Sequence, residues 1–163
     1  MIVIVIIGVI YTLAISKLQS VAQQKVAPNF SNLKEYLHSF IKEDARTAKF
    51  LCLDDCSECS IYVDGVEERS IESFLDASVE VYRYDLLQGA QSLEPVPFFN
   101  ADGVQKRVCF SFEVDKNLIS DQVMIVYKKR AYDYTSYFSP AEVYDSLSDL
   151  VDAKEAKREE VSR

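Results

Sequence analysis

Residues 1–15 read MIVIVIIGVIYTLAI, a stretch without a charged side chain in which Tyr11 and Thr12 are the only polar residues. A segment that is apolar on every face must be buried on all sides in water or lie in lipid. As a helix it would span roughly 22 Å, whereas a bilayer core is about 30 Å thick and takes roughly 20 apolar residues. The stretch is therefore short for a complete span, and we expect the natural sequence to begin upstream of Met1.

The flanks of this stretch argue against two simpler interpretations. A secretory signal peptide begins with a basic region and ends with a small-residue cleavage site, but here the first basic residue, Lys17, follows the apolar residues. In a plain anchor, Lys17 and Lys25 would remain in the cytoplasm by the positive-inside rule. That orientation would place the four cysteines of the chain in a reducing compartment. A basic leader upstream of Met1 would remove both difficulties.

Residues 2–19, IVIVIIGVIYTLAISKLQ, resemble the N-terminal helix of the type IV pilins and type II secretion pseudopilins. The match is centred on residues 5–9 and on the exit segment around Lys17. Ser16 stands where that family often has proline, and the family's leader, processing site and glutamate would all precede Met1. The resemblance covers about the first twenty residues and does not extend into the rest of the chain.

The resemblance implies a structural subunit that is held in the inner membrane by a single pass and assembles with other pilin-like subunits. Its head would lie on the periplasmic side or on a surface filament, and its partners would include membrane lipid, a prepilin peptidase and an inner-membrane platform. Gly8 fits such packing, because a small residue lets neighbouring membrane helices approach closely. The predicted assembly residues are Ile2, Val3, Ile4, Val5, Ile6, Ile7, Gly8, Val9, Ile10, Leu13 and Ile15.

Composition restricts the remaining functions. The net charge is −8 and the pI about 4.7, which argues against a nucleic-acid partner. The chain has one His and no Trp, and it contains no glycine-rich phosphate loop, nucleophile elbow or two-histidine metal motif. His38 is expected to be packed or at the surface. The oxygen-bearing pairs Asn100–Asp102 and Asp54–Asp55 do not match the spacing of a calcium loop. We therefore expect no enzyme, no cofactor and no metal site.

The predicted fold is α+β: a long N-terminal hydrophobic helix, a second helix, a small antiparallel β-sheet head and a C-terminal helix. The corresponding domains are residues 1–27 for membrane and assembly, 28–152 for the head and 153–163 for a polar tail. Apolar residues at helical spacing predict the second helix over 31–48. Residues 66–78 suggest a short helix or turn. Ser139, Pro140 and Glu142 form a capping-box pattern that predicts the start of the last helix. Strands are predicted over 50–53, 60–64, 79–85, 107–114 and 122–134.

Four cysteines, Cys52, Cys56, Cys59 and Cys109, support two disulfides or a four-thiolate zinc site. The oxidising side of a membrane favours disulfides. If Leu51 and Leu53 point into the core, strand alternation places Cys52 and Cys109 together on the outer face. Four cysteines allow three pairings, and only under this condition would the pairs be Cys52–Cys109 and Cys56–Cys59.

An alternative from another functional class is a membrane-anchored periplasmic thiol-disulfide or metal-binding protein that uses the same four cysteines. The acidic neighbours Asp54, Asp55 and Glu58 count against a reactive thiol, because such thiols usually lie in positively charged surroundings.

Overall fold

A computed structural model describes residues 27–99 and 102–161 of the chain. In this part of the molecule 41% of residues are in strands and 16% are helical, so the α+β prediction is wrong and the fold is mostly β. Two helices are present in the described ranges, and neither is long and apolar enough to cross a membrane. The predicted long N-terminal helix falls on residues outside the described ranges.

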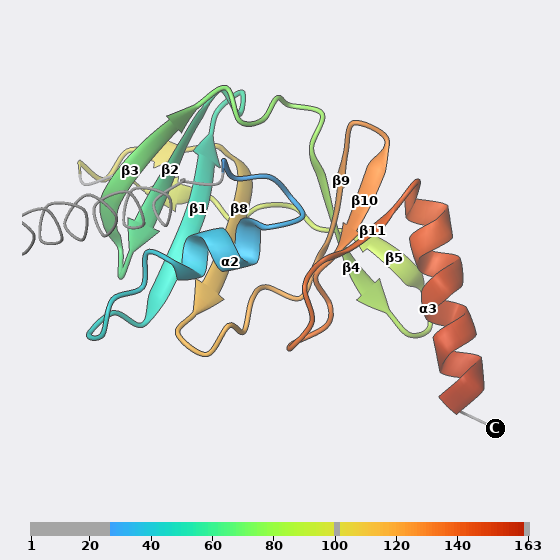
Figure 1. Cartoon of the computed structure of the whole chain (residues 1–163). Helices are drawn as coiled ribbons and strands as arrows, with labels where there is room; N and C mark the ends of the chain where they lie inside the picture. Colours follow the sequence, from blue (N-terminus) through green and yellow to red (C-terminus); the bar gives the residue numbers. More distant parts are fainter. Residues whose placement is uncertain (1–26, 100–101, 162–163) are drawn as a thin grey trace, which may run out of the picture.

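The first half of the head is a four-stranded antiparallel sheet in the order β3-β2-β1-β8 (Figure 1). Its strands are β1 (Thr47–Leu53), β2 (Glu58–Val63), β3 (Val66–Glu72) and β8 (Val108–Asp115). Asp64 and Gly65 make the β2–β3 turn, both with positive φ, as a two-residue hairpin loop requires. Residues 66–78, read from the sequence as a short helix or turn, instead begin with an edge strand.

The second half is a five-stranded antiparallel sheet in the order β11-β10-β9-β4-β5. Its strands are β4 (Glu80–Asp85), β5 (Gly89–Ser92), β9 (Met124–Tyr127), β10 (Arg130–Asp133) and β11 (Glu142–Tyr144). Residues 122–134, predicted to be one strand paired with its predecessor, form the β9–β10 hairpin in the other sheet. A two-stranded ribbon, β6 (Phe98–Phe99) with β7 (Gln105–Lys106), lies between β5 and β8 in the sequence.

Helix α2 (Leu33–His38) covers the inner face of the first sheet. Leu33 and Leu37 are fully buried, so the predicted apolar stripe does face the core. The helix is much shorter than the predicted 31–48, because Thr47 and Ala48 already pair with β8 and β2 as part of β1. The buried ammonium of Lys34 donates to the carbonyl oxygen of Tyr137 at 2.7 Å and thereby fastens the loop that precedes β11.

Helix α3 (Leu147–Val161) ends the described chain and packs against β10 and β11 through Leu150, which is fully buried. The predicted capping box at Ser139 is wrong, because residues 142–144 form β11 instead. The residue that caps the helix is Ser146, seven residues after Ser139. Asp149 donates its backbone N–H to Oγ of Ser146 at 3.1 Å, and that hydroxyl donates to the Asp149 carboxylate at 2.7 Å.

Candidate functional site

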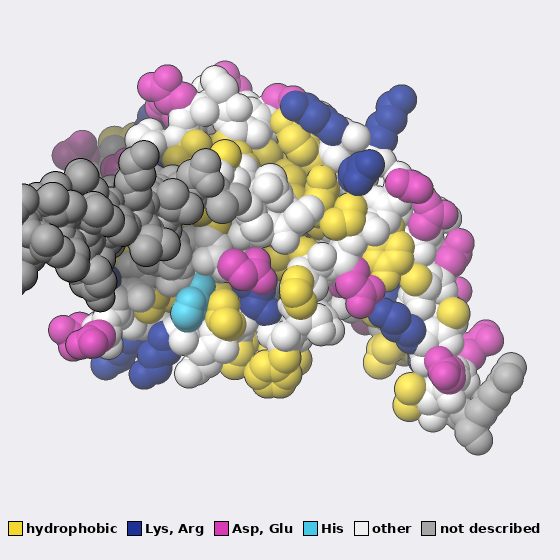
Figure 2. All heavy atoms as spheres, viewed as in Figure 1, with side chains coloured by type: hydrophobic (Ala, Val, Ile, Leu, Met, Phe, Trp, Pro, Cys, Tyr) yellow, Lys and Arg dark blue, Asp and Glu magenta, His cyan; other side chains and the backbone are white. Residues whose placement is uncertain are grey.

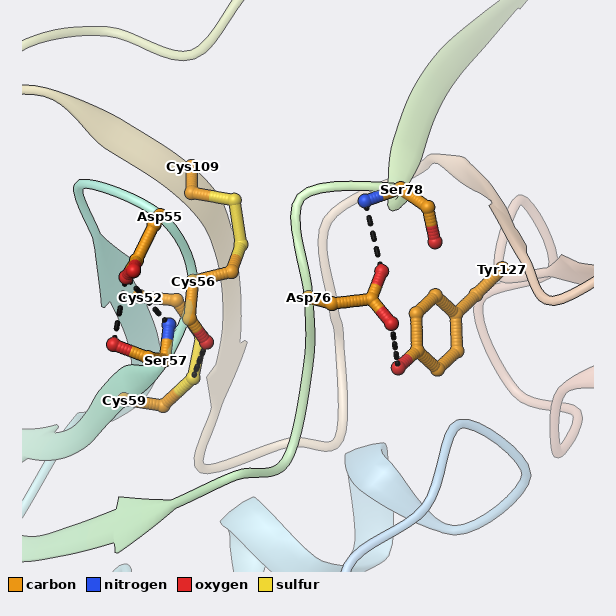
Figure 3. The surroundings of a disulfide bond; sticks show 9 residues. All are labelled: Cys52, Asp55, Cys56, Ser57, Cys59, Asp76, Ser78, Cys109 and Tyr127. Atoms are coloured by element: carbon orange, nitrogen blue, oxygen red, sulfur yellow. Dashed lines mark hydrogen bonds between the residues drawn. A yellow bond between two sulfur atoms is a disulfide. The ribbon is translucent and has the colours of Figure 1, made fainter.

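All four cysteines lie at one end of the first sheet and form two disulfides (Figure 3). Cys52 on β1 and Cys59 on β2 are direct register partners with a Cα–Cα distance of 4.0 Å. Cys56, in the turn between these strands, is joined to Cys109 on β8, with a Cα–Cα distance of 5.5 Å and a sequence separation of 53 residues. The first bridge therefore joins β1 to β2 at the base of their turn, and the second fixes the turn to β8.

The observed pairing differs from the predicted one because the inward-facing set of β1 residues is the opposite one. Phe50 and Cys52 belong to the main core, whereas Leu51 is buried under a loop on the outer face. On β8 the register shifts between Cys52 and Leu53, so that Cys109 has no cross-strand partner and packs against the core. Such a bulge redirects a side chain, and an alternation rule read from sequence cannot place it.

The surroundings of the disulfides favour a structural role. Cys52, Cys56 and Cys59 are fully buried, so three of the four sulfurs that an exchanging thiolate could attack are enclosed in the protein. Asp55 in the turn accepts hydrogen bonds from the hydroxyl and the backbone N–H of Ser57, which lower the pKa of Asp55. A four-thiolate zinc site would need all four sulfurs free. Within the described ranges no other grouping of His, Cys, Asp and Glu is suited to hold a metal ion.

The junction of the two sheets holds a cluster of aromatic rings around Phe30. The Phe30 ring lies 5.2–5.6 Å, centroid to centroid, from four neighbours: Phe74, Phe110, Tyr127 and Tyr132. Phe30 also accepts a hydrogen bond at its carbonyl from the buried hydroxyl of Tyr134, and burial raises the pKa of Tyr134. These contacts tie residues just after Pro28 to both sheets.

A cavity of about 510 Å³ opens beside this cluster. Rings form part of its wall, and two cations, Lys128 and Arg130, stand at its edge. Residues of the first described turn also border it, so the chain enters the head next to this cavity. The lining residues are Pro28, Asn29, Phe30, Ser73, Phe74, Tyr127, Lys128, Arg130 and Tyr132.

The β9–β10 hairpin carries three consecutive basic residues, Lys128, Lys129 and Arg130, all exposed. Tyr127 pairs with Arg130, so the two lysines are the whole turn, with φ of 46° and 65°. The Lys128 ammonium lies 4.8 Å from the centre of the Tyr127 ring. The hydroxyl of Tyr127 donates to Asp76 at 3.2 Å, which joins the hairpin to the segment that connects the two sheets (Figure 3). We call Lys128, Lys129 and Arg130 the basic tip.

A second hollow, of about 600 Å³, lies on the outer face of the first sheet beneath residues 93–98. Its charged groups are largely paired. The Lys49 ammonium forms a salt bridge with the Glu113 carboxylate at 3.0 Å, and the Asp121 carboxylate accepts a hydrogen bond from the Glu113 backbone N–H at 2.9 Å. Burial raises the pKa of Asp121 above its ordinary value. The Glu113 carboxylate thus joins β8 to β1, and the Asp121 carboxylate joins β8 to the loop that follows it.

The predicted assembly residues, Ile2 to Ile15, lie outside the described residues, so the structure places none of them. The basic tip was missed in the sequence, although three successive cations in a chain of net charge −8 were a usable signal. The cavity beside the tip had no sequence signal, because its walls come from three separate segments. Comparison with protein families, curated proteins and solved structures finds no match to this chain.

Proposed function

We propose that the chain is a pilin-like structural subunit of a type II secretion pseudopilus or a type IV pilus. Its apolar residues 2–15 hold it in the inner membrane and pack against other subunits. The disulfide-bonded β head stands on the periplasmic side or on the filament surface. In this role the head presents a surface and carries out no reaction.

The observation that carries the proposal is the combination, in one chain, of two disulfides with a charge-free opening of fifteen residues. Disulfides persist in oxidising compartments, which supports a head outside the cytoplasm. The apolar opening supplies a reason for the chain to be held at a membrane. The resemblance of residues 2–19 to the pilin family then favours assembly over simple anchoring.

The architecture of the head is also suited to a structural role. Both disulfides are internal to one sheet, and the aromatic cluster around Phe30 joins that sheet to the second one. Such a head resists local opening, which suits a subunit that is exposed outside the cell. The thiol-disulfide and metal-binding alternative gains no support from the buried cysteines.

Gly8 provides the test. We expect Gly8→Arg to abolish crosslinking between subunits in isolated membranes, because a long cation prevents close approach of neighbouring segments. Gly8→Ala is the matched control and should retain most of the crosslinking. Non-reducing mass spectrometry must show both disulfides in each variant, so that a loss is not due to misfolding of the head. Unchanged crosslinking of Gly8→Arg, or a chain that needs no detergent for extraction, would contradict the proposal.

A further inference from the structure

We propose that the basic tip and the aromatic cavity beside it form a docking site for anionic lipid headgroups, which holds the head down against the membrane. This inference rests on the proposed function, because it takes residues 2–15 to lie in that membrane. The lipid phosphate would be held between Lys128 and Arg130. The rings beneath them would face the interfacial region of the bilayer.

The first argument is the position of the tip. Pro28 and Asn29 border the same cavity as Lys128 and Arg130, so the chain enters the head there. Twelve residues, 16–27, separate this point from the apolar stretch, and fully extended they reach about 40 Å. A tether this short gives the head a high effective concentration at the surface, so a weak site suffices.

The second argument is backbone strain at the turn. Both turn residues have positive φ, 46° and 65°, a conformation for which Asn and Gly are the favourable residues. Lysine at each position costs stability that an Asn-Gly turn would not. Strain of this kind is concentrated at functional positions, and here it places two ammonium groups at the most prominent point of the hairpin.

The third argument is the combination of charge and ring chemistry. Figure 2 shows Lys and Arg side chains gathered over the β9–β10 hairpin, with hydrophobic side chains directly beside them. Tyr127 and Tyr132 combine an apolar ring with a polar hydroxyl, which suits the membrane–water boundary. Each cation near an anionic surface strengthens attraction about five-fold, so three cations give on the order of 100-fold. Asp76 is the acidic group facing Lys128, and it offsets part of this attraction.

The other occupants fit less well. Residues 1–34 of the chain contain no carboxylate, so the basic tip has no attraction for the chain's own N-terminal segment. A second copy offers acidic surface, but nothing about the position of the tip beside the chain entry favours that partner. The lipid surface accounts for the charge, the rings and the place where the chain enters.

The test uses the full chain in nanodiscs of neutral phosphatidylcholine, with or without about one-third phosphatidylglycerol, followed by hydrogen exchange of residues 124–133. We expect exchange there to be about ten-fold slower with the anionic lipid, and the protection to disappear in 0.5 M salt, which screens surface charges. The decisive variant is Lys128→Asn with Lys129→Gly. It should lose the lipid-dependent protection while unfolding at an equal or higher urea concentration, because its turn is relaxed.

The matched control removes two exposed lysines from other loops, Lys42→Gln with Lys116→Gln, and should keep the protection. Equal exchange in neutral and anionic discs would overturn the inference. So would protection that depends on protein concentration and not on lipid, which would indicate a second copy at the tip. Failure of the chain to enter either kind of disc is a different result, because it would overturn the proposed function itself.

Discussion

The two halves of the head are held together by different means. The sheet of β1, β2, β3 and β8 carries both disulfides, whereas the sheet of β4, β5 and β9–β11 has no covalent crosslink among its described residues. In their place the second sheet has a buried ion pair, Asp133 with Lys154 at 2.7 Å, which fastens helix α3 to β10. The comparison teaches that the sheet containing the longest-range strand pairing, β1 with β8, is the one that is crosslinked.

The largest effect should come from removing the bridge that spans more of the chain. Cys56→Ser with Cys109→Ser opens a loop of 53 residues, and chain entropy predicts a loss of about 4 kcal/mol in the free energy of unfolding. Cys52→Ser with Cys59→Ser opens a separation of 7 residues and should cost about 2 kcal/mol. Urea unfolding of both variants measures the difference. Equal losses would mean that the length of the closed loop does not determine how much each disulfide stabilises the first sheet.

The second prediction concerns the sheet without disulfides. Lys154→Met leaves the Asp133 carboxylate buried without its cation and should cost about 3 kcal/mol. Lys157→Met is the matched control on the same helix, because its pair with Glu142 is exposed and should be worth less than about 1 kcal/mol. Hydrogen exchange should locate the loss of Lys154→Met in α3 and β10. A loss spread equally over both sheets would show that the halves unfold as one unit.

The smallest effect is a pH dependence in the first sheet. The pKa of Asp64 lies below its ordinary 3.8, because the carboxylate accepts the backbone N–H groups of Thr47 and Arg46. A lowered folded-state pKa contributes stability that is present above the unfolded-state value and is lost as pH falls through the folded-state value. Asp64→Asn should therefore reduce the slope of unfolding free energy against pH below about 4. Glu68→Gln removes an equal charge from β3, and a matching change in its slope would refute the assignment.

Local patterns predicted much of the secondary structure in this molecule. The alternation in residues 107–114 predicted β8, and its residues Phe110, Phe112 and Val114 are fully buried. The strand over residues 79–85 is also present, as β4. Leu33, Leu37 and Leu150 were placed correctly in helices that bury them. In these segments the periodicity of apolar residues matches the geometry of the element, and no distant contact is needed to choose it.

The errors arise where a tertiary contact competes with a local helix signal. Ser139-Pro140 is a good helix start, yet the following residues pair with β10 because a free sheet edge is available there. The predicted helix does not continue through residues 39–46, because the Asp64 carboxylate of another hairpin holds the backbone N–H groups of Arg46 and Thr47. In each case hydrogen bonds to another strand or hairpin outweighed a modest local helix propensity.

The sequence by itself determined that this chain has an uncharged apolar opening, an acidic head with enough apolar residues for a core, and four cysteines suited to disulfides. Those properties depend on composition and on short-range spacing. The tertiary structure alone decided which cysteines pair, which strands share a sheet, and that the basic tip lies beside the point where the chain enters the head. The cysteine pairing depends on strand register and on a bulge at Cys109. All three features are set by contacts between segments far apart in the sequence.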